Sequence, residues 1–175
     1  MTNNPYEGLQ EFVAQLPEFL QPLLIAALGA IPYVEGEGAA GIGIIVGLNP
    51  ILAAVAGATG NILCVLAVVT LTSRLRESVV ERRVATAEPA SDPEPAAPTR
   101  GAKGRARLRR WLVRFGVPGA SILAPLALPT PLTAAFFVGS GVPKRWVMLW
   151  QVVAIVLWTG LIAAAATGLV TLLGW

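Results

Sequence analysis

Two acidic residues, Glu35 and Glu37, interrupt a stretch of sequence that is otherwise apolar. Residues 1–72 contain no Lys or Arg, so no base nearby in the sequence neutralises these carboxyls. A charged acid at the centre of a bilayer costs at least about 2.5–3.5 kcal/mol, and acids retained there usually serve function. Gly36 and Gly38 alternate with the acids and allow a non-helical backbone, on which residues i and i+2 point the same way. The pattern predicts two carboxyls that face one cavity, which suits proton coupling or binding of a cationic substrate.

Two other interpretations of the acid pair stay open. The carboxylates could cap a helix over 38–48, because the positive end of the helix dipole favours negative charge. They could also lie in an aqueous vestibule at the outer surface of the protein. Capping and a functional role are compatible, so the first alternative does not exclude a binding site.

Uncharged polar residues supply the other candidates. Asn61 lies within a long apolar run, where an amide more often bonds a neighbouring helix than a ligand. A second break in the apolar sequence holds two threonines and two prolines, and its prolines would leave backbone carbonyls free to line a path. The predicted substrate- or proton-binding residues are Glu35, Glu37, Asn61, Thr130 and Thr133. The predicted breaks are Pro32, Gly36, Gly38, Pro129 and Pro131.

The composition indicates a membrane protein. Of the 175 residues 55% are hydrophobic and 13% are charged, about half the charged share of an ordinary soluble domain, and the mean hydropathy is +0.67. The chain has no His, which excludes His-dependent catalytic triads. With one Cys in addition, few residues remain that could form a zinc site. We expect no enzymatic activity, no cofactor and no bound metal.

The apolar sequence contains two long runs and two pairs of short runs. The long runs, 50–73 and 144–173, exceed the roughly 20 apolar residues that a spanning helix needs. The paired short runs, 22–48 and 116–142, are each interrupted by glycine or proline. They predict re-entrant hairpins, since irregular backbone at membrane depth is tolerated only inside protein or beside a water-filled cavity. A spanning helix kinked at the proline is the alternative.

The two halves of the chain share this order of elements. A shift of 94 positions aligns Glu35 with Pro129 and Gly47 with Gly141, although sequence identity between the halves is negligible. Eleven of the 13 bases lie in residues 73–114, so the positive-inside rule places the loop 74–114 in the cytoplasm and both termini outside. The hairpins then enter from opposite sides. We predict an all-α integral membrane protein in which two re-entrant helical hairpins, each followed by a long spanning helix, form an inverted repeat.

The segments around these elements have simpler roles. Lys144 and Arg145, together with Arg114, would mark the cytoplasmic face or contact lipid headgroups there. The chain is predicted to begin with an outer amphipathic segment over 1–21, followed by a first repeat over 22–83 whose spanning helix extends into the cytoplasm. A disordered linker over 84–103 then leads to a second repeat over 104–175. The second repeat starts with a basic amphipathic segment, 104–115.

The sequence resembles a known family at two places. Residues 30–43, which read Ala-Ile-Pro-Tyr-Val-Glu-Gly-Glu-Gly-Ala-Ala-Gly-Ile-Gly, together with the later Gly60-Asn61, look like the small multidrug export (efflux) proteins of bacteria. Residues 128–133, Leu-Pro-Thr-Pro-Leu-Thr, resemble the second, proline-containing break of that family. The family is distantly similar to the DedA-type membrane proteins, which have paired re-entrant hairpins and are linked to translocation of lipid carriers. The resemblance points to Pro32, Glu35, Asn61, Pro129 and Pro131 as functional positions.

The chain departs from these families at two positions. Glu37 stands where relatives often carry an arginine, and Ala120 and Ser121 follow Pro118-Gly119 where DedA-type proteins have an arginine. Both departures remove positive charge, so the resemblance gives less support to recognition of a lipid phosphate at the hairpins.

The preferred functional hypothesis is a small transporter of the bacterial plasma membrane, with proton-coupled export of small or cationic compounds. A DedA-type lipid translocase or scramblase, and a membrane scaffold without transport activity, are the alternatives. The expected partners are membrane lipids and a small-molecule or lipid substrate, and no nucleic acid. At 18.3 kDa and with two full spans, one chain can hardly enclose a path, so we expect a homodimer or larger homo-oligomer.

Overall fold

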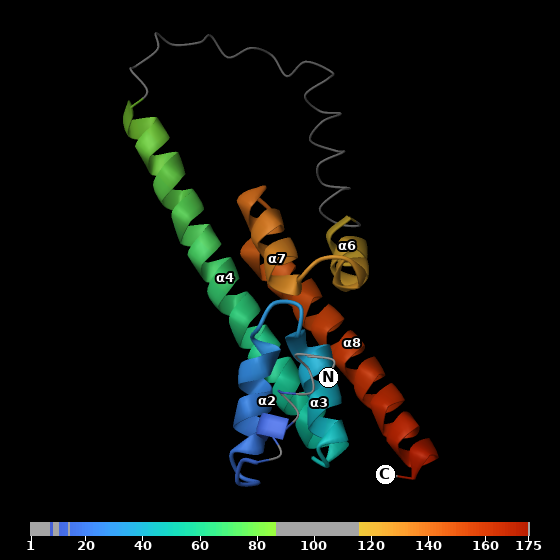
Figure 1. The fold of residues 1–175 in the computed structure, drawn as a ribbon. Helices are drawn as coiled ribbons and strands as arrows, with labels where there is room; N and C mark the ends of the chain where they lie inside the picture. The colour runs from blue at the N-terminus through green and yellow to red at the C-terminus, as the bar shows by residue number, and fades with distance from the viewer. Residues whose placement is uncertain (1–7, 9–10, 14, 87–115, 175) are drawn as a thin grey trace.

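The computed structural model describes residues 8, 11–13, 15–86 and 116–174 of the chain. Across these residues the regular structure is helical and contains no strand, which confirms the all-α prediction. Figure 1 shows two long helices that run obliquely through the molecule, with short helices packed along them. The elements are α2 (Gln21–Gly29), α3 (Glu35–Ile45), α4 (Pro50–Thr86), α6 (Val117–Leu123), the 3-10 turn η2 (Ala124–Leu126), α7 (Thr130–Gly139) and α8 (Lys144–Leu173).

The long helices α4 and α8 are, among the described helices, the two that are long and apolar enough to cross a membrane. Asn49 caps the start of α4, because its side-chain oxygen accepts hydrogen bonds from the N–H groups of Ile51 and Leu52. At 1.5 Å per residue α4 is about 55 Å long, well beyond the roughly 30 Å of a hydrocarbon core. It continues through Thr86, so residues 84–86 belong to this helix and not to the predicted linker. The rest of that linker and the basic segment 104–115 lie outside the described residues.

The short helices bring two distant parts of the chain together. The turn 30–34 joins α2 to α3, and residues 127–129 lead from η2 into α7. In Figure 1 the α2–α3 turn and the start of α7 are neighbours, partway along the long helices. With 9, 11 and 10 residues, α2, α3 and α7 are each too short to cross a bilayer alone.

The three prolines predicted to break the helices lie at or beside helix starts and turns. Pro32 lies in the α2–α3 turn, and Pro129 immediately precedes α7. Pro131 is in the first turn of α7, where a proline removes no intrahelical hydrogen bond.

The structure corrects the prediction for Gly36 and Gly38, which lie inside α3 and not in a break. Their backbone is helical, and the N–H of Gly38 bonds the carbonyl of Val34 at 2.9 Å. Gly36 is needed for close packing, because a Cβ there would collide with the hydroxyl of Thr159 on α8. Gly36 therefore serves a contact between helices, whereas a Cβ on Gly38 would meet only Val34, at 3.4 Å.

Glycines also let α4 approach α2 and α3 very closely. A Cβ on Gly60 would collide with the carbonyl oxygen of Ala26, and one on Gly57 would lie 2.7 Å from the carbonyl oxygen of Gly36. A Cβ on Gly29 would in turn collide with the backbone of Gly57. Only glycine fits at these positions without moving a helix.

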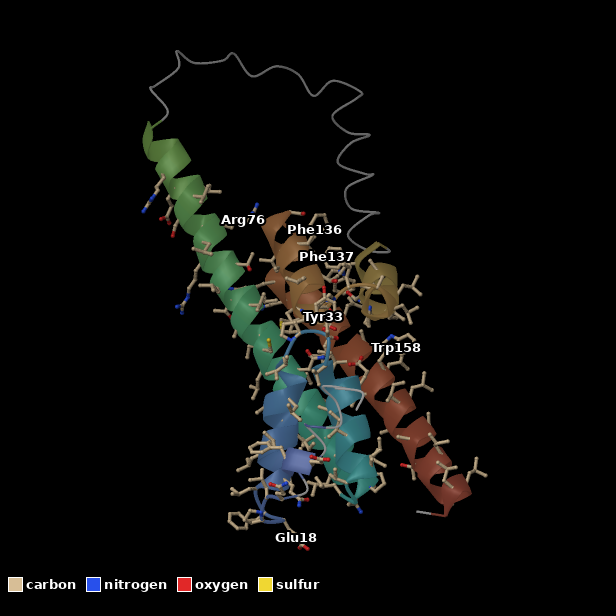
Figure 2. All side chains as sticks on the ribbon, viewed as in Figure 1. Glu18, Tyr33, Arg76, Phe136, Phe137 and Trp158 are labelled. Carbon is tan, nitrogen blue, oxygen red and sulfur yellow. The ribbon has the colours of Figure 1, made fainter. Side chains whose placement is uncertain are left out.

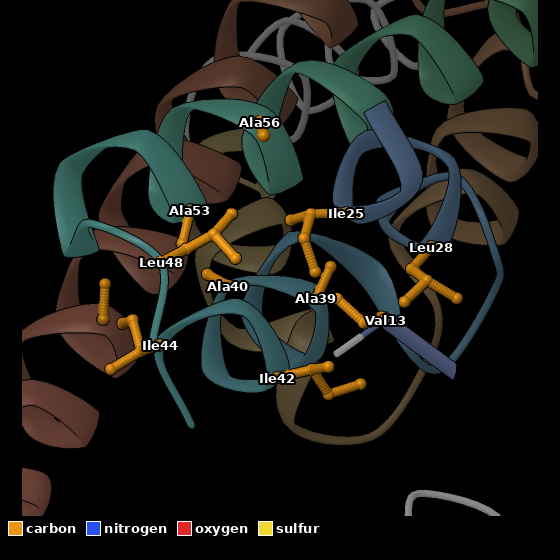
Figure 3. Packing of buried hydrophobic residues seen from close by; sticks show 11 residues of the cluster. Val13, Ile25, Leu28, Ala39, Ala40, Ile42, Ile44, Leu48, Ala53 and Ala56 are labelled. Carbon is orange, nitrogen blue, oxygen red and sulfur yellow. The ribbon is translucent and has the colours of Figure 1, made fainter. Parts of the chain in front are cut away.

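Two apolar clusters stabilise the arrangement. The first joins α2, α3 and the beginning of α4 (Figure 3), and its buried members include Val13, Ile25, Leu28, Ala39, Ala40, Ile42, Ile44, Leu48, Ala53 and Ala56. The second joins α4, α7 and α8 through Val65, Val69, Ala134, Val138, Val147 and Ile155.

Large apolar side chains also point away from the molecule along both long helices (Figure 2). An exposed apolar surface of this kind is typical of a face that lipid or another protein chain covers. On α4 and α8 its members include Ile51, Val55, Leu63, Leu71, Val156, Leu161 and Leu169.

Candidate functional site

A cavity of about 370 Å³ lies where the α2–α3 turn, the η2–α7 segment and α8 meet. Its lining is mostly apolar, and two carboxyl groups border it. The lining includes Tyr33, Glu35, Glu37, Leu128, Trp158 and Ile162.

Glu35 links the two halves of the chain at the edge of this cavity. Its side chain is 6% exposed, and each carboxyl oxygen accepts one hydrogen bond from Thr130. The N–H of Thr130 donates to Oε1 at 2.6 Å, and the Thr130 hydroxyl donates to Oε2 at 2.6 Å. These bonds cap the first turn of α7, whose own N-cap residue, Pro129, supplies no side-chain cap.

The positive end of α7 therefore faces the Glu35 carboxylate, and Glu35 itself belongs to the first turn of α3. Glu35 is the first residue of α3, and its carboxylate binds the first residue of α7. Each helix N-terminus presents unpaired N–H groups and favours negative charge. This arrangement stabilises a carboxylate in a buried position where the sequence supplies no base.

Backbone strain accompanies the placement of Glu35. Tyr33 has φ of 71° and Glu35 has φ of 51°, values in the left-handed region that residues with a Cβ seldom adopt. Each such residue costs on the order of 1–3 kcal/mol and is kept only where the surrounding structure enforces it. Strain of this kind concentrates at functional sites.

The structure corrects the predicted arrangement of Glu37. Glu35 has a left-handed backbone at the first position of α3 and Glu37 lies within that helix, so the two acids do not share an extended backbone. Glu37 is less buried than Glu35 and also borders the cavity. Its Oε1 is buried and has no hydrogen-bond partner within the described part of the chain. The two acids therefore differ in their contacts: Glu35 accepts one hydrogen bond on each oxygen, and Oε1 of Glu37 accepts none from the described residues.

The two threonines of the second break differ in the same way. Thr130 holds Glu35, whereas the hydroxyl of Thr133 donates to the carbonyl of Pro129 within its own helix, at 3.3 Å. Thr133 is 8% exposed. The structure thus brings Glu35 and Glu37 to the cavity, bonds Thr130 to Glu35, and places Thr133 one turn further along α7.

Other buried polar side chains have no hydrogen-bond partner among the residues that the structure describes. Asn61 on α4 and Gln151 on α8 are 0% and 1% exposed, and both polar atoms of each amide are unpaired. Ser121 on α6 and Thr159 on α8 are likewise buried and unpaired. Buried polar groups in proteins are nearly always satisfied by protein or by water, so these side chains indicate places for internal water.

Sequence reasoning did not single out Thr159 or the role of Trp158. Trp158 Nε1 donates to the carbonyl of Ile122 at 2.8 Å and so ties α6 to α8 beside the cavity. Thr159 is a polar residue in an otherwise apolar part of α8, and this position could have drawn attention to it. The signal is weak, because the hydroxyl of a threonine in a helix often bonds only its own backbone.

The predicted cationic residues lie elsewhere. Lys144 and Arg145 are the first two residues of α8. Neither residue lines the cavity that Glu35 and Glu37 border. Arg114 lies outside the described residues. The described His, Cys, Asp and Glu residues form no group of three that could hold a metal ion.

No protein-family model, curated protein or solved structure matches this chain.

Proposed function

We propose that this chain is a small transporter of the bacterial plasma membrane that exports small or cationic compounds in exchange for protons. The observation that carries the proposal is the Glu35 carboxylate, buried at the junction of two short helices beside a cavity that Glu37 also borders. The motif resemblance to small multidrug export proteins supports it.

The short helices favour a re-entrant interpretation. At 1.5 Å per residue, α3 and α7 extend about 16 and 15 Å from the junction, roughly half of a hydrocarbon core. A hairpin that enters from one face and returns would place each helix start near the middle of the membrane. With the basic loop 74–114 in the cytoplasm, the two hairpins form an inverted repeat, the arrangement of many secondary transporters.

The acids favour a proton or a cation as the coupled species. A carboxylate can bind either a proton or the cationic group of a substrate, so one site can exchange a proton for the substrate. The described residues around the cavity include no Lys or Arg that would compete as a counterion. Its apolar lining, with Trp158 and Ile162, suits the organic part of a cationic compound.

A second copy of the chain completes the proposed transporter. The exposed apolar faces of α4 and α8 supply the surface for pairing, and a homodimer would give the cavity a further wall. Crosslinking in native membranes followed by gel analysis tests this part, and a monomer alone would contradict it.

Transport in proteoliposomes tests the function. Purified protein is reconstituted with an imposed pH gradient, and uptake of a fluorescent organic cation such as ethidium is followed with proton flux. We expect Glu35→Gln and Glu37→Gln to abolish or strongly reduce coupled uptake. Glu81→Gln, which changes an exposed acid on the far part of α4, is the matched control and should transport normally. Equal activity of all variants would refute the proposal.

Cysteine labelling tests the topology. In a Cys64→Ala background, Glu18→Cys and Ile45→Cys should react with an impermeant maleimide from the outside, and Ser140→Cys from the cytoplasm. All three positions are exposed. Labelling of residues 18 and 45 from opposite faces would show that α2 and α3 do not form a hairpin.

A further inference from the structure

A second cavity, of about 330 Å³, lies where α4 passes the turn between α7 and α8. It is separate from the cavity of the acids and shares no lining residue with it. Side chains of two segments far apart in sequence form it. Those used below are Ser73, Arg76, Glu77, Gly141, Lys144 and Arg145.

Three positive charges and one negative charge border this cavity. Within the described residues, Arg76, Lys144 and Arg145 form no ion pair. Glu77 accepts a hydrogen bond from the hydroxyl of Ser73 at 3.1 Å and offsets one of the three positive charges. The lining keeps an excess of positive charge, which a bound anion would offset.

The backbone adds donors to the same place. The N–H groups of Trp146 and Val147 bond the carbonyl of Pro143, so those of Lys144 and Arg145 precede the first bonds of α8. The turn before them bends at Gly141, whose φ is 90°. The positive end of a 30-residue helix therefore lies in the lining of this cavity.

We propose that this cavity binds a phosphate group through Arg76, Lys144, Arg145 and the start of α8. Guanidinium groups match phosphate oxygens in pairs, and the Lys ammonium adds a point charge. Figure 2 shows Arg76 on the side of α4 that faces α7. The volume accommodates a phosphate with a small substituent, so the group is either the headgroup of an anionic lipid or a free phosphate. This site would sit at the end of the molecule that carries the bases, apart from the transport cavity.

The test compares two arginines of one helix. Arg76 lines the cavity, whereas Arg74 is exposed on another face of α4, beside Leu71. Full-length protein in a non-ionic detergent is titrated with short-chain phosphatidic acid, with short-chain phosphatidylcholine and with inorganic phosphate. We expect saturable binding of phosphatidic acid or of phosphate, weakened at high salt. Arg76→Gln should weaken it about tenfold or more, the factor for loss of one charge-assisted hydrogen bond, and Arg74→Gln should leave it unchanged.

The outcomes separate the sources of the phosphate. Tight binding of phosphatidic acid with little binding of inorganic phosphate identifies a lipid headgroup site. Binding of inorganic phosphate that competes with the lipid identifies a site for free phosphate. Equal effects of Arg76→Gln and Arg74→Gln, or equal binding of phosphatidylcholine, would overturn the proposal. A double variant, Lys144→Gln/Arg145→Gln, gives an independent check if Arg76→Gln does not fold.

Discussion

The carboxylate of Glu35 accepts one hydrogen bond on each oxygen, and both come from Thr130, 95 residues away. One donor is a backbone N–H and the other a hydroxyl, so the pair fixes position and orientation together. Glu35 opens α3 and Thr130 opens α7. The contact therefore joins the start of α3 to the start of α7.

This contact predicts strong energetic coupling between Glu35 and Thr130. Hydrogen bonds to a charged group are each worth about 1.5–3 kcal/mol, and Thr130→Val removes the hydroxyl donor while it keeps the shape. We expect Glu35→Gln and Thr130→Val to be non-additive by about 1 kcal/mol or more in a double-mutant cycle of unfolding in detergent. Thr130→Ser keeps the donor and serves as the control. Additive effects would contradict the contact.

The close approach of α4 to α2 predicts that Gly60→Ala is destabilising. The added methyl would meet the carbonyl of Ala26, and overpacking of this kind typically costs about 1–3 kcal/mol. Gly160→Ala on α8 is the matched control, because nothing lies within 4 Å of its Cβ. That control should be neutral or stabilising by up to about 1 kcal/mol. Thermal unfolding of both variants in one detergent checks the difference, and equal midpoints would refute it.

The bond from Trp158 to Ile122 predicts that Trp158 holds α6 in place. Trp158→Phe keeps an aromatic ring but removes the donor. We expect the amides of Val117–Leu123 to exchange hydrogen faster in this variant, by about tenfold for a loss near 1.4 kcal/mol. In Trp150→Phe exchange should not change, since Trp150 Nε1 has no partner in the described part of the chain. Unchanged exchange in both variants would show that α6 is held by packing alone.

Asn61 provides a test for internal water. Its amide is fully buried and has no protein partner among the described residues, so internal water would supply its hydrogen bonds. We expect Asn61→Leu to lower the free energy of unfolding by about 1–3 kcal/mol and to slow coupled transport, because it removes the polar group that holds this water. Ile62→Leu, next in sequence, should change neither. An Asn61→Leu variant more stable than the original protein would show that no water satisfies the amide.

The all-helical fold and its long apolar helices could be predicted because apolar length is a local signal. The positions of Pro32 and Pro129 at the breaks also follow from the local chemistry of proline. The roles of Gly36 and Gly38 could not be predicted in this way. Glycine is compatible with both a break and a tight helix contact, and only the approach of Thr159 to Gly36 decides between them.

The same limit applies to the site. Glu35 and Glu37 stand out in the sequence as acids without a base nearby, and both border the cavity. Their different environments depend on tertiary packing, because Thr130 bonds the Glu35 carboxylate whereas Oε1 of Glu37 is buried without a partner among the described residues. The bond to Thr130 depends on tertiary structure, since no local pattern connects residues that lie in separate halves of the chain.

The glycine contacts of α4 have a mechanical consequence. Gly57 touches both Gly29 and Gly36, so α2, α3 and α4 meet at one point where no side chain separates their backbones. Such a junction allows little sliding, and these three helices should move as one rigid body. Glu35 belongs to this rigid body as the first residue of α3, and its two bonds to Thr130 fix the start of α7 to the same body. A load applied at either junction would therefore reach both halves of the chain.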